Sequence, residues 1–518
     1  MIESKEVSHW EPREPSAPRF LGLLIVAIAA WPVGAAPEGQ MTWAVHVSLV
    51  PTWFDPAETS GILSQFLILY ALHDAMVKPG QPMAAGLAES WTASADGLVY
   101  DFVLRRGVTF HNGDPVTAED VKFSFERYRG ISHTPLKEAV AAVETPDPRR
   151  VRFRLKRPWP DFMTFYANAT GAGWIVAKKY IEKVGDEGFK KAPIGAGPYR
   201  FVSFTPGVEL VMEAFDQYWR KAPHVKRLVL RAIPDDSTRL AALKRGEVDL
   251  AYQIRGPLGE EVRRSPGLAL KGVAIQGTHW VNFVDQWDPK SPSHDRRVRL
   301  AANYAIDRST LNQAEYLGFG QITWSIVPRS FEFYWQAPGY SYDPARARQL
   351  LAEAGYPNGF NAGDYSCDAA FASLAEAVGN YLNAAGIRVK IRPLERAAFF
   401  RGFADKKYRG LIHSFSAAFG NATTRIEAFV AAGGAYVYGS YVDIDGLYRE
   451  QVAELDPKRR EAILHRIQQL VHDKAMFAPI LASAALTGVG PRVEEAGLGL
   501  IAGYPFSAPY EEVKLKAK

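Results

Sequence analysis

The chain has 518 residues, of which 47% are hydrophobic and 23% charged, and these fractions exclude the disordered, collagen-like and coiled-coil classes. Its length predicts two or three domains, each able to bury a core of its own. The net charge of +5 is small and both signs are interspersed, which argues against nucleic acid as a partner, and the single cysteine, Cys367, excludes an internal disulfide framework.

The N-terminal segment, residues 1–36, is predicted to be a signal peptide for export. Residues 20–36 form a long apolar stretch, Arg19 precedes it, and the small residues Gly34-Ala35-Ala36 offer a cleavage point. A spanning helix needs roughly 20 apolar residues, so cleavage is favoured, but retention as an anchor stays open. We expect a periplasmic body without lipid attachment, because no cysteine lies near the cleavage point.

Local signals then predict helices and strands in turn. Capping side chains followed by an apolar periodicity predict helices that begin after Thr117, Ser237, Asp343 and Asp456. Alternating or continuous apolar runs predict strands over 98–104, 151–155, 199–204, 225–233, 248–254 and 387–391. Gly195-Ala196-Gly197, followed at once by Pro198, is expected to be a tight loop entering a strand. Helix and strand alternate most regularly between about 295 and 479, which indicates α/β layering there.

Residues that carry catalysis or bind metals occur without the spacing that such chemistry needs. His465 and His472 lie two helical turns apart, whereas one metal ion takes partners a single turn apart. His279 and His413 are isolated and are expected to be structural, and Cys367 is expected to be buried or inert. No G-x-S-x-G elbow and no phosphate loop occurs. The sequence therefore predicts no catalytic residue, no metal and no cofactor.

Large aromatic side chains cluster where loops are predicted, at Trp53, Phe54, Trp280, Phe415 and Phe419. Rings in loops often line ligand pockets, because they supply contact area at little cost in entropy. Packing in a core is an equally good interpretation of any one of them. Both interpretations stay open.

A series of longer motifs runs through nearly the whole chain. They are LAESWTASADGLVYDFVLRRGVTFHNGDPVTAEDV (87–121), IGAGPYRF (194–201), FDQYW (215–219), IPDDSTRLAALKRGEVDL (233–250), VRLAANYAIDRSTL (298–311) and YDPARARQLLAEAGYPNGF (342–360). In this order they resemble the family 5 extracellular solute-binding proteins of ABC importers, the dipeptide, oligopeptide and nickel group.

The resemblance implies an α/β fold, the two-lobed periplasmic-binding-protein clamshell with an additional inserted subdomain. By analogy, the first lobe contains residues 37–62, 185–276 and 481–518, the inserted subdomain residues 63–184, and the second lobe residues 277–480. The chain then crosses between the lobes near 276–282 and again near 477–480. Trp91, Arg105 and Asp114 of the first motif are expected to serve the fold and not the ligand.

The resemblance also implies a function without catalysis. A peptide or small-molecule ligand held between two lobes stabilises their closed form. The loaded protein then docks on the ABC permease subunits of the inner membrane, which work with an ATPase. We expect a monomeric receptor in the periplasm. Two alternatives remain, a solute sensor or chaperone-like binding protein on the same fold and a secreted hydrolase.

One motif of the peptide-binding relatives is altered here. In those relatives an acidic residue in a Trp-x-x-Asp-type stretch, followed by an Asp-Pro, neutralises the ligand's α-ammonium group. The similar stretch of this chain, residues 413–422, has Phe415 at the tryptophan position, Ala418 at the acid and Asn421-Ala422 in place of Asp-Pro. An ammonium group buried without its counter-charge costs several kcal/mol, so the role of that acid is not carried over.

A neutral or anionic solute is the expectation that follows. The loop over 414–425 is polar and aromatic, and Arg425 offers two parallel hydrogen bonds to a carboxylate or phosphate, with a solvated charge on a helix face as the alternative. Few oxygen or imidazole donors are present, which disfavours nickel. The predicted ligand-binding residues are Trp53, Phe54, Trp280, Asn282, Phe415, Ser416, Phe419, Asn421 and Arg425.

Overall fold

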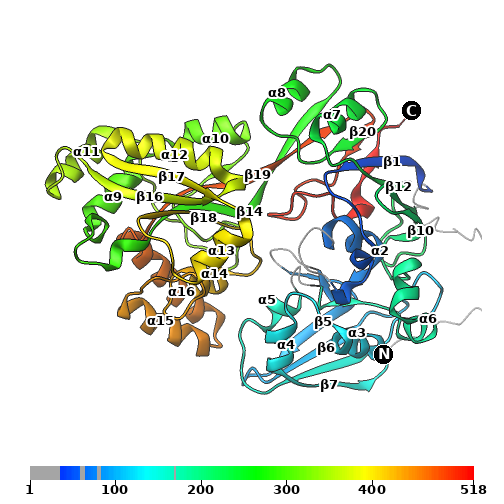
Figure 1. The fold of residues 1–518 in the computed structure, drawn as a ribbon. Coiled ribbons are helices and arrows are strands. Elements are labelled where there is room, and N and C mark those ends of the chain that lie inside the picture. The colour runs from blue at the N-terminus through cyan, green and yellow to red at the C-terminus, as the bar shows by residue number, and fades with distance from the viewer. Residues whose placement is uncertain (1–35, 59–64, 79–82, 168–170, 518) are drawn as a thin grey trace, which may run out of the picture. The chain divides into compact units, whose positions relative to one another are not determined.

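The computed structural model describes residues 36–58, 65–78, 83–167 and 171–517. The predicted signal peptide, apart from Ala36, lies outside these residues. Residues 36–518 form one compact unit in which helices and strands are mixed (Figure 1). The predicted α/β class is confirmed.

A large mixed sheet of 11 strands organises this unit. Its strands stand in the order β10, β11, β12, β1, β13, β19, β14, β18, β16 and β17, and β15 pairs with β19. Their bounds are β1 Glu38–Val45, β10 Tyr199–Thr205, β11 Glu209–Ala214, β12 Val225–Ala232, β13 Leu250–Ala251, β14 Ala269–Phe283, β15 Gln321–Ile322, β16 Phe360–Asp368, β17 Ile387–Leu394, β18 Leu411–Ser416 and β19 Phe477–Val489. The pairs of β1 with β12 and β13 and of β16 with β17 and β18 are parallel, and the others are antiparallel.

The strand predicted over 248–254 is wrong in its length, because β13 contains only Leu250 and Ala251. Gln253 has a φ of 54°, which ends the extended backbone. The guanidinium of Arg239, in α7 (Asp236–Lys244), donates to the Gln253 carbonyl at 2.8 Å. Helix α7 is also capped two residues earlier than predicted, since Asp235 and not Ser237 accepts the hydrogen bond of a free backbone N–H group.

Strands β14 and β19 lie between two parts of the large sheet, one made of β1 and β10–β13 and the other made of β16–β18, and they connect these two parts. Strand β14 pairs with β18 and β19, and β19 pairs in addition with β13. Their register shifts between Ala274, which faces Ala484, and Thr278, which faces Ala482, so that residues 275–277 stand opposite Ser483 alone. The crossings predicted near 276–282 and 477–480 fall in these strands. The lobe boundaries stay a prediction.

A smaller sheet of four antiparallel strands forms a core of its own. Its order is β5 (Ala88–Ala93), β6 (Val99–Leu104), β8 (Arg150–Leu155) and β7 (Val140–Asp147). Tyr100, Phe102 and Leu104 of β6 alternate toward the buried face. Helix α3 (Ala118–Arg127) packs on this sheet and begins at the predicted capping box, where the Thr117 N–H donates to Asp120 at 2.9 Å.

Further helices cover both sheets. Their bounds are α4 His133–Ala139, α5 Phe162–Tyr166, α6 Lys178–Lys191, α8 Gly256–Arg264, α9 Arg296–Ala305, α10 Arg308–Tyr316, α11 Pro344–Glu353, α12 Ala372–Ala385, α13 Arg396–Ala404, α14 Ala422–Phe429, α15 Val442–Ala453 and α16 Pro457–Asp473. The predicted starts of α11 and α16 are confirmed, since Asp343 and Asp456 each accept a backbone N–H of the first turn at 2.8 Å. Helices α15 and α16 lie side by side (Figure 1).

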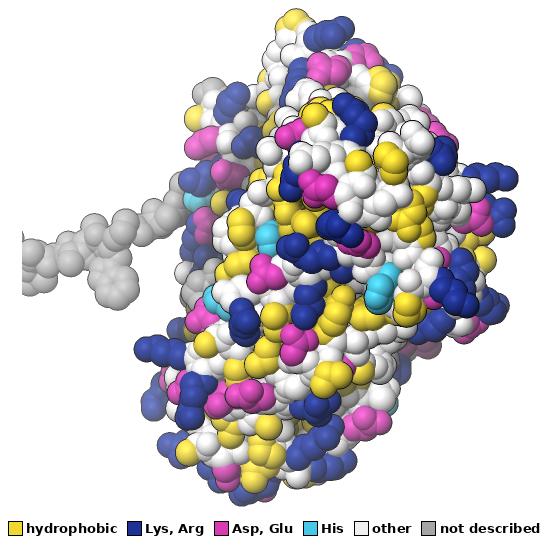
Figure 2. All heavy atoms as spheres, turned by 90° about the vertical axis from the view of Figure 1, so that its left-hand side faces the viewer, with side chains coloured by type: hydrophobic (Ala, Val, Ile, Leu, Met, Phe, Trp, Pro, Cys, Tyr) yellow, Lys and Arg dark blue, Asp and Glu magenta, His cyan; other side chains and the backbone are white. Residues whose placement is uncertain are grey.

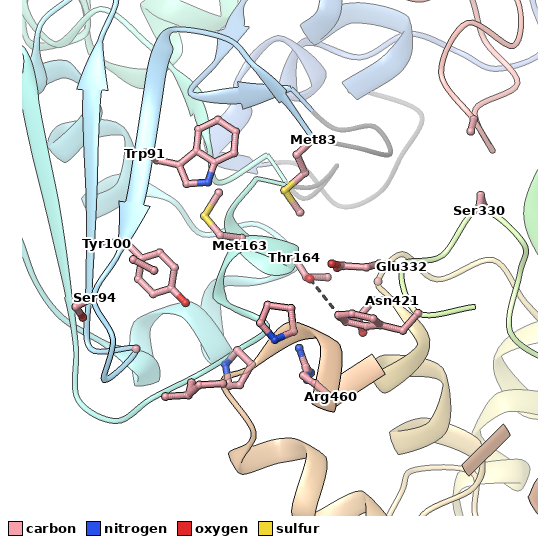
Figure 3. A pocket seen from close by; sticks show the side chains of 18 of the residues that line it. Met83, Trp91, Ser94, Tyr100, Met163, Thr164, Ser330, Glu332, Asn421 and Arg460 are labelled. Atoms are coloured by element: carbon pink, nitrogen blue, oxygen red, sulfur yellow. Dashed lines mark hydrogen bonds between the residues drawn. The ribbon is translucent and has the colours of Figure 1, made fainter. Parts of the chain in front are cut away.

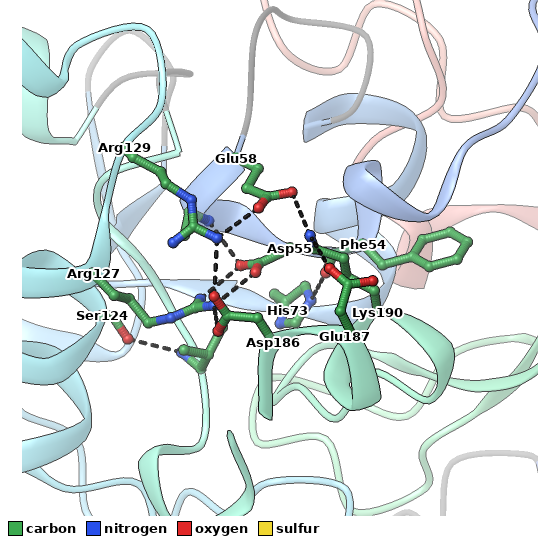
Figure 4. Close-up of polar contacts among 12 residues, drawn as sticks. Phe54, Asp55, Glu58, His73, Ser124, Arg127, Arg129, Asp186, Glu187 and Lys190 are labelled. Atoms are coloured by element: carbon green, nitrogen blue, oxygen red, sulfur yellow. Dashed lines mark hydrogen bonds and ion pairs between the residues drawn. The ribbon is translucent and has the colours of Figure 1, made fainter. Parts of the chain in front are cut away.

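An ion-pair network fastens the segment around Asp55 and Glu58 to α3 and α6 (Figure 4). Asp55 is fully buried, and its two oxygens accept from Arg127 at 2.7 and 2.8 Å. Arg127 also contacts Asp186 at 2.7 Å, while Arg129 pairs with Glu58 at 2.6 Å. A buried carboxylate with two charge-assisted hydrogen bonds is well compensated, so this network is a structural junction.

On the face that Figure 2 presents, basic and acidic side chains are interspersed.

A buried chain of hydrogen bonds crosses the middle of the large sheet. His279 Nδ1 and His413 Nε2 share a hydrogen bond of 3.0 Å, so the two histidines isolated in the sequence lie side by side. His413 Nδ1 contacts the Tyr365 hydroxyl at 2.8 Å, and His279 Nε2 contacts the Ser483 hydroxyl at 2.8 Å. The Tyr316 hydroxyl extends the chain to Ser483 at 3.0 Å. The structural role predicted for both histidines fits this satisfied, buried position.

Stability should fall in acid because of these histidines. Burial lowers the pKa of His413 to about 3 and that of His279 well below its usual value. Between about pH 6.5 and pH 3 the unfolded chain therefore binds more protons at these sites, and the free energy of unfolding decreases as the pH falls. Denaturant unfolding at several pH values measures the slope. Replacing His413→Gln should make the slope shallower by up to about 1.4 kcal/mol per pH unit, and His133→Gln, at an exposed position, is the control. An unchanged slope in the His413 variant contradicts this account.

The loop before β10, which contains Gly195, has the tight conformation predicted. A substitution at Gly195 tests how closely this loop is packed. A Cβ at this position would lie 1.9 Å from the Leu72 carbonyl oxygen. We expect Gly195→Ala to cost about 3 kcal/mol or more of unfolding free energy, because backbone atoms have to move. Gly446, inside α15, has open space around it, so Gly446→Ala should stabilise by about 0.5–1 kcal/mol. Equal midpoints of thermal unfolding for the two variants would refute the packing argument.

Candidate functional site

A cavity of about 790 Å³ is the candidate binding site. Its size is typical of pockets for small ligands. The larger apolar side chains that line it are Met83, Trp91, Tyr100, Met163, Phe333 and Tyr504. The polar side chains are Ser94, Thr164, Gln276, Ser330, Glu332, Asn421 and Arg460. Figure 3 shows Trp91, Tyr100 and Met163 on one side and Glu332 and Asn421 on the other.

The small sheet supplies the aromatic wall. Trp91 lies on β5 and Tyr100 on β6, where the Tyr100 ring packs on Phe162 with centroids 4.6 Å apart. Trp91, expected from the sequence to serve the fold, lines the cavity. Arg105 and Asp114, in contrast, make local contacts, since the Arg105 side chain donates to the Gly86 carbonyl at 3.2 Å and Asp114 accepts from the Asn112 side chain at 2.8 Å.

A buried ion pair joins the two walls of the cavity. Arg460, in the first turn of α16, donates to both carboxylate oxygens of Asp161 at 2.7 and 2.8 Å. Asp161 stands just before α5, at the edge of the small sheet's core. Arg460 also donates to the Thr423 hydroxyl at 2.9 Å, and its guanidinium lies 5.4 Å from the centre of the Phe333 ring. Breaking such a pair leaves an uncompensated buried charge, so both residues hold these segments together.

Asn421 strengthens the same junction. Its side-chain oxygen caps α14, accepting from the Thr424 N–H at 3.3 Å. Its side-chain nitrogen donates to Asp161 at 2.5 Å and to the Thr164 hydroxyl at 3.2 Å, the contact drawn in Figure 3. Asn421 thus connects the start of a helix that follows β18 to residues on the opposite wall.

The predicted site residues fall in different environments. Asn421 lines the cavity. Phe419 stacks on the ring of Tyr504, a cavity residue, with centroids 5.6 Å apart. Trp53 is half-buried, and Phe54 is fully buried in the core around β1. A ligand contact at Trp53, Phe54 or Phe419 stays a prediction.

Four further predicted residues lie on the neighbouring strands β14 and β18. Trp280 is fully buried, and Asn282 and Ser416 are buried beside it in the sheet. Phe415 is half-buried and packs on Phe371 with ring centroids 4.4 Å apart. The described residues that line the cavity do not include these four. Their contact with a ligand also stays a prediction.

Arg425 lies below the surface and is only 2% exposed. It donates to the Ser416 carbonyl at 3.0 Å, and its guanidinium lies 5.4 Å from the centre of the Phe331 ring. Burial lowers the pKa of Arg425 to about 9. The interpretation as a solvated helix-face charge is therefore wrong, while a contact with an anion stays a prediction.

Sequence reasoning missed Asp161, Glu332 and Arg460. The cap at Asp456 placed Arg460 in a first helical turn, but nothing local indicated its partner far away in the chain. Glu332 follows β15 in an irregular segment without periodicity. Its carboxyl is exposed toward the cavity, and the surrounding protein raises its pKa by desolvation.

The described ranges contain neither a candidate metal site nor a candidate membrane-spanning helix. Among residues 36–58, 65–78, 83–167 and 171–517, no group of three or more His, Cys, Asp or Glu side chains is placed to hold a metal ion. Within the same ranges, no helix has both the length and the hydrophobicity needed to cross a membrane.

Known proteins similar to this chain agree on one family. The model of bacterial extracellular solute-binding proteins, family 5 middle, matches residues 83–436. Glutathione-binding protein GsiB of Salmonella choleraesuis (strain SC-B67) is 30% identical over 346 residues, which are 65% of this chain and 65% of that protein. The match thus spans less than two thirds of this relative. Heme-binding protein A of Haemophilus influenzae is 27% identical over 452 residues, 79% of this chain and 80% of its own.

A solved structure agrees on the fold. The ABC transporter substrate binding protein CtaP of Listeria monocytogenes has a TM-score of 0.79 at 21% identity, over 93% of this chain and 100% of that one. The predicted periplasmic-binding-protein fold of the three-domain type is confirmed. Because the family model covers more than half of its length, this chain belongs to family 5 of the bacterial extracellular solute-binding proteins.

Proposed function

We propose that this chain is the solute-binding component of an ABC importer and that it binds a peptide or a related small solute in the cavity between Trp91 and Asn421. Membership of family 5 supports this proposal. Two similar proteins are named for the solutes that they bind, glutathione in one case and heme in the other. Glutathione is itself a small peptide. The cavity adds an aromatic wall and a few polar groups, the composition typical of pockets that bind and orient small ligands.

The observation that carries the proposal is the Asp161–Arg460 junction. It brings together two walls that come from distant parts of the chain. A solute that touches both walls favours the arrangement in which they meet, by as much as its affinity differs between the closed and open arrangements. Binding is thereby converted into a change of shape that a transporter can recognise.

The remaining parts of the proposal concern the cellular setting. The protein is exported to the periplasm through residues 1–36 and works as a monomer. Its loaded form docks on permease subunits of the inner membrane, which are driven by their ATPase. The solute is released chemically unchanged, without a cofactor.

Solute capture is tested by mass spectrometry of the small molecules that co-purify with the exported protein. We expect one or a few solutes, which raise the midpoint of thermal unfolding when they are added back to stripped protein. The same solutes should be recovered intact after prolonged incubation. Recovery of cleaved products would favour the hydrolase, and a protein that no recovered solute stabilises would overturn the proposal.

The junction is tested by Asp161→Asn, which leaves the buried Arg460 without its counter-charge. We expect the arrangement in which the walls meet to lose about 3–5 kcal/mol of stability relative to the open arrangement. Small-angle scattering should show a larger radius of gyration, and calorimetry should show affinity for the co-purified solute reduced at least about tenfold. Asp101→Asn is the matched control, because Asp101 pairs with Arg152 at 2.7 Å on the exposed face of the small sheet. Equal effects of the two changes would contradict a special role for Asp161.

A further inference from the structure

The charges at the cavity do not balance. Two charged side chains, Glu332 and Arg460, are among the described residues that line it. The charge of Arg460 is taken up by Asp161 at 2.7 Å. No ion pair or hydrogen bond to the Glu332 carboxyl is found in the described ranges of the chain. Within the described ranges the Glu332 carboxylate thus has no direct partner, and the charge of Arg460, which Asp161 already binds, offsets its charge in part.

The backbone holds Glu332 firmly in this place. Its carbonyl oxygen accepts the N–H of Ala422, the first residue of α14, at 3.0 Å. Phe331 before it is buried in the core, and Phe333 after it is fixed by a hydrogen bond of 2.7 Å from Gln468 to its carbonyl. Phe333 has a φ of 63°, a conformation that costs a non-glycine residue about 1 kcal/mol or more. The strained turn thus follows Glu332 directly, and the Glu332 side chain points toward the cavity, which it lines together with the half-buried Phe333 (Figure 3).

Neighbouring charges add to the excess of carboxylates. Glu427 of α14 lies close enough to Asp161 for the negative charge of Asp161 to add to the effect of desolvation in raising its pKa. Arg425 does not offset this excess at the cavity, since it is buried among aromatic rings and donates to the Ser416 carbonyl. Asp161 and Glu332 thus both interact with the guanidinium of Arg460, and Glu427 adds a further carboxylate close to Asp161.

The opposite wall suits a ligand that is apolar as well as positively charged. Trp91 and Tyr100 come from the small sheet, with the sulfur-containing side chains of Met83 and Met163 beside them (Figure 3). The faces of aromatic rings attract cations, and methionines adapt to irregular apolar shapes.

We propose that Glu332 is a specificity-determining residue that pairs with a cationic group of the bound solute, an ammonium or a guanidinium, while the apolar part of the solute packs on Trp91 and Tyr100. This inference rests on the proposed function, because it assigns the substrate class of the same cavity. It reverses the sequence-based expectation of a neutral or anionic solute. That expectation considered residues 413–425 alone, whereas Glu332 reaches the cavity from an earlier segment.

The test uses the purified full-length protein and a panel of matched triplets. Each triplet contains a primary amine (a short peptide or an aromatic amine), its N-acetyl derivative and its N-succinyl derivative. The three members differ mainly in the charge of one group, which is positive, neutral or negative. Thermal shift ranks the panel and calorimetry measures the dissociation constants. We expect the amines to bind at least about tenfold more tightly than their derivatives.

Variants connect this preference to Glu332. Glu332→Gln should weaken the tightest amine at least about tenfold and leave its N-acetyl derivative within about twofold, whereas Glu332→Asp, which keeps the carboxylate, should retain the preference for amines. Glu450→Gln is the matched control, because Glu450 is exposed on α15 and does not line the cavity. Tighter binding of neutral or anionic members, or equal losses in Glu332→Gln and Glu450→Gln, overturns this inference and leaves the proposed function standing. If no member of the panel and no co-purified solute binds, both this inference and the proposed function are overturned.

Discussion

The antiparallel pairing of β14 with β19 fixes the middle of the large sheet and thereby the position of the elements on both sides of it. These strands of 15 and 13 residues pair with β18 on one side and with β13 on the other, so one hydrogen-bonded ladder runs through both parts of the sheet. Buried backbone groups have to be paired, and the ladder therefore fixes where the two parts meet. The ladder is interrupted at residues 275–277, where extra residues bend a strand and increase its twist. Gln276 in this interruption lines the cavity, and Ser483 opposite it bonds to His279.

Buried cations show how structural and functional charges differ in this protein. Arg299 donates to the carbonyls of Ser293, His294, Lys474 and Ala475, and Arg308 donates to that of Pro479. Carbonyl dipoles offset the cost of burying these charges and fix the start of β19. Arg460 is compensated differently, by a carboxylate from the opposite wall of the cavity. These three cations all depend on segments far away in the chain, but the partner of Arg460 carries a negative charge, whereas the carbonyl partners of Arg299 and Arg308 are neutral.

The character of the cavity follows from the same principle. Within residues 413–425, Ala418 stands at the position where the resemblance to peptide-binding proteins implies an acid, and this segment alone suggests a site without negative charge. The folded chain brings Asp161 and Glu332 to that segment from two other parts of the chain. Electrostatic energy depends on distance in space, so the charge of a site belongs to all the segments that reach it.

Many of the local elements, and the family, could be inferred before the structure was known. A cap acts within three or four residues, which is why Thr117, Asp343 and Asp456 marked their helices correctly, while the ordered motifs between 87 and 360 indicated the fold. The set of aromatic and charged side chains that face the cavity, in contrast, became visible in the folded chain alone. Trp280 and Trp91 are equally apolar in the sequence, yet one is sealed in the sheet and the other lines the site. The two tryptophans differ in burial because burial depends on which distant surfaces pack together. The same holds for ion pairs such as that of Asp161 with Arg460, and no local pattern carries this information.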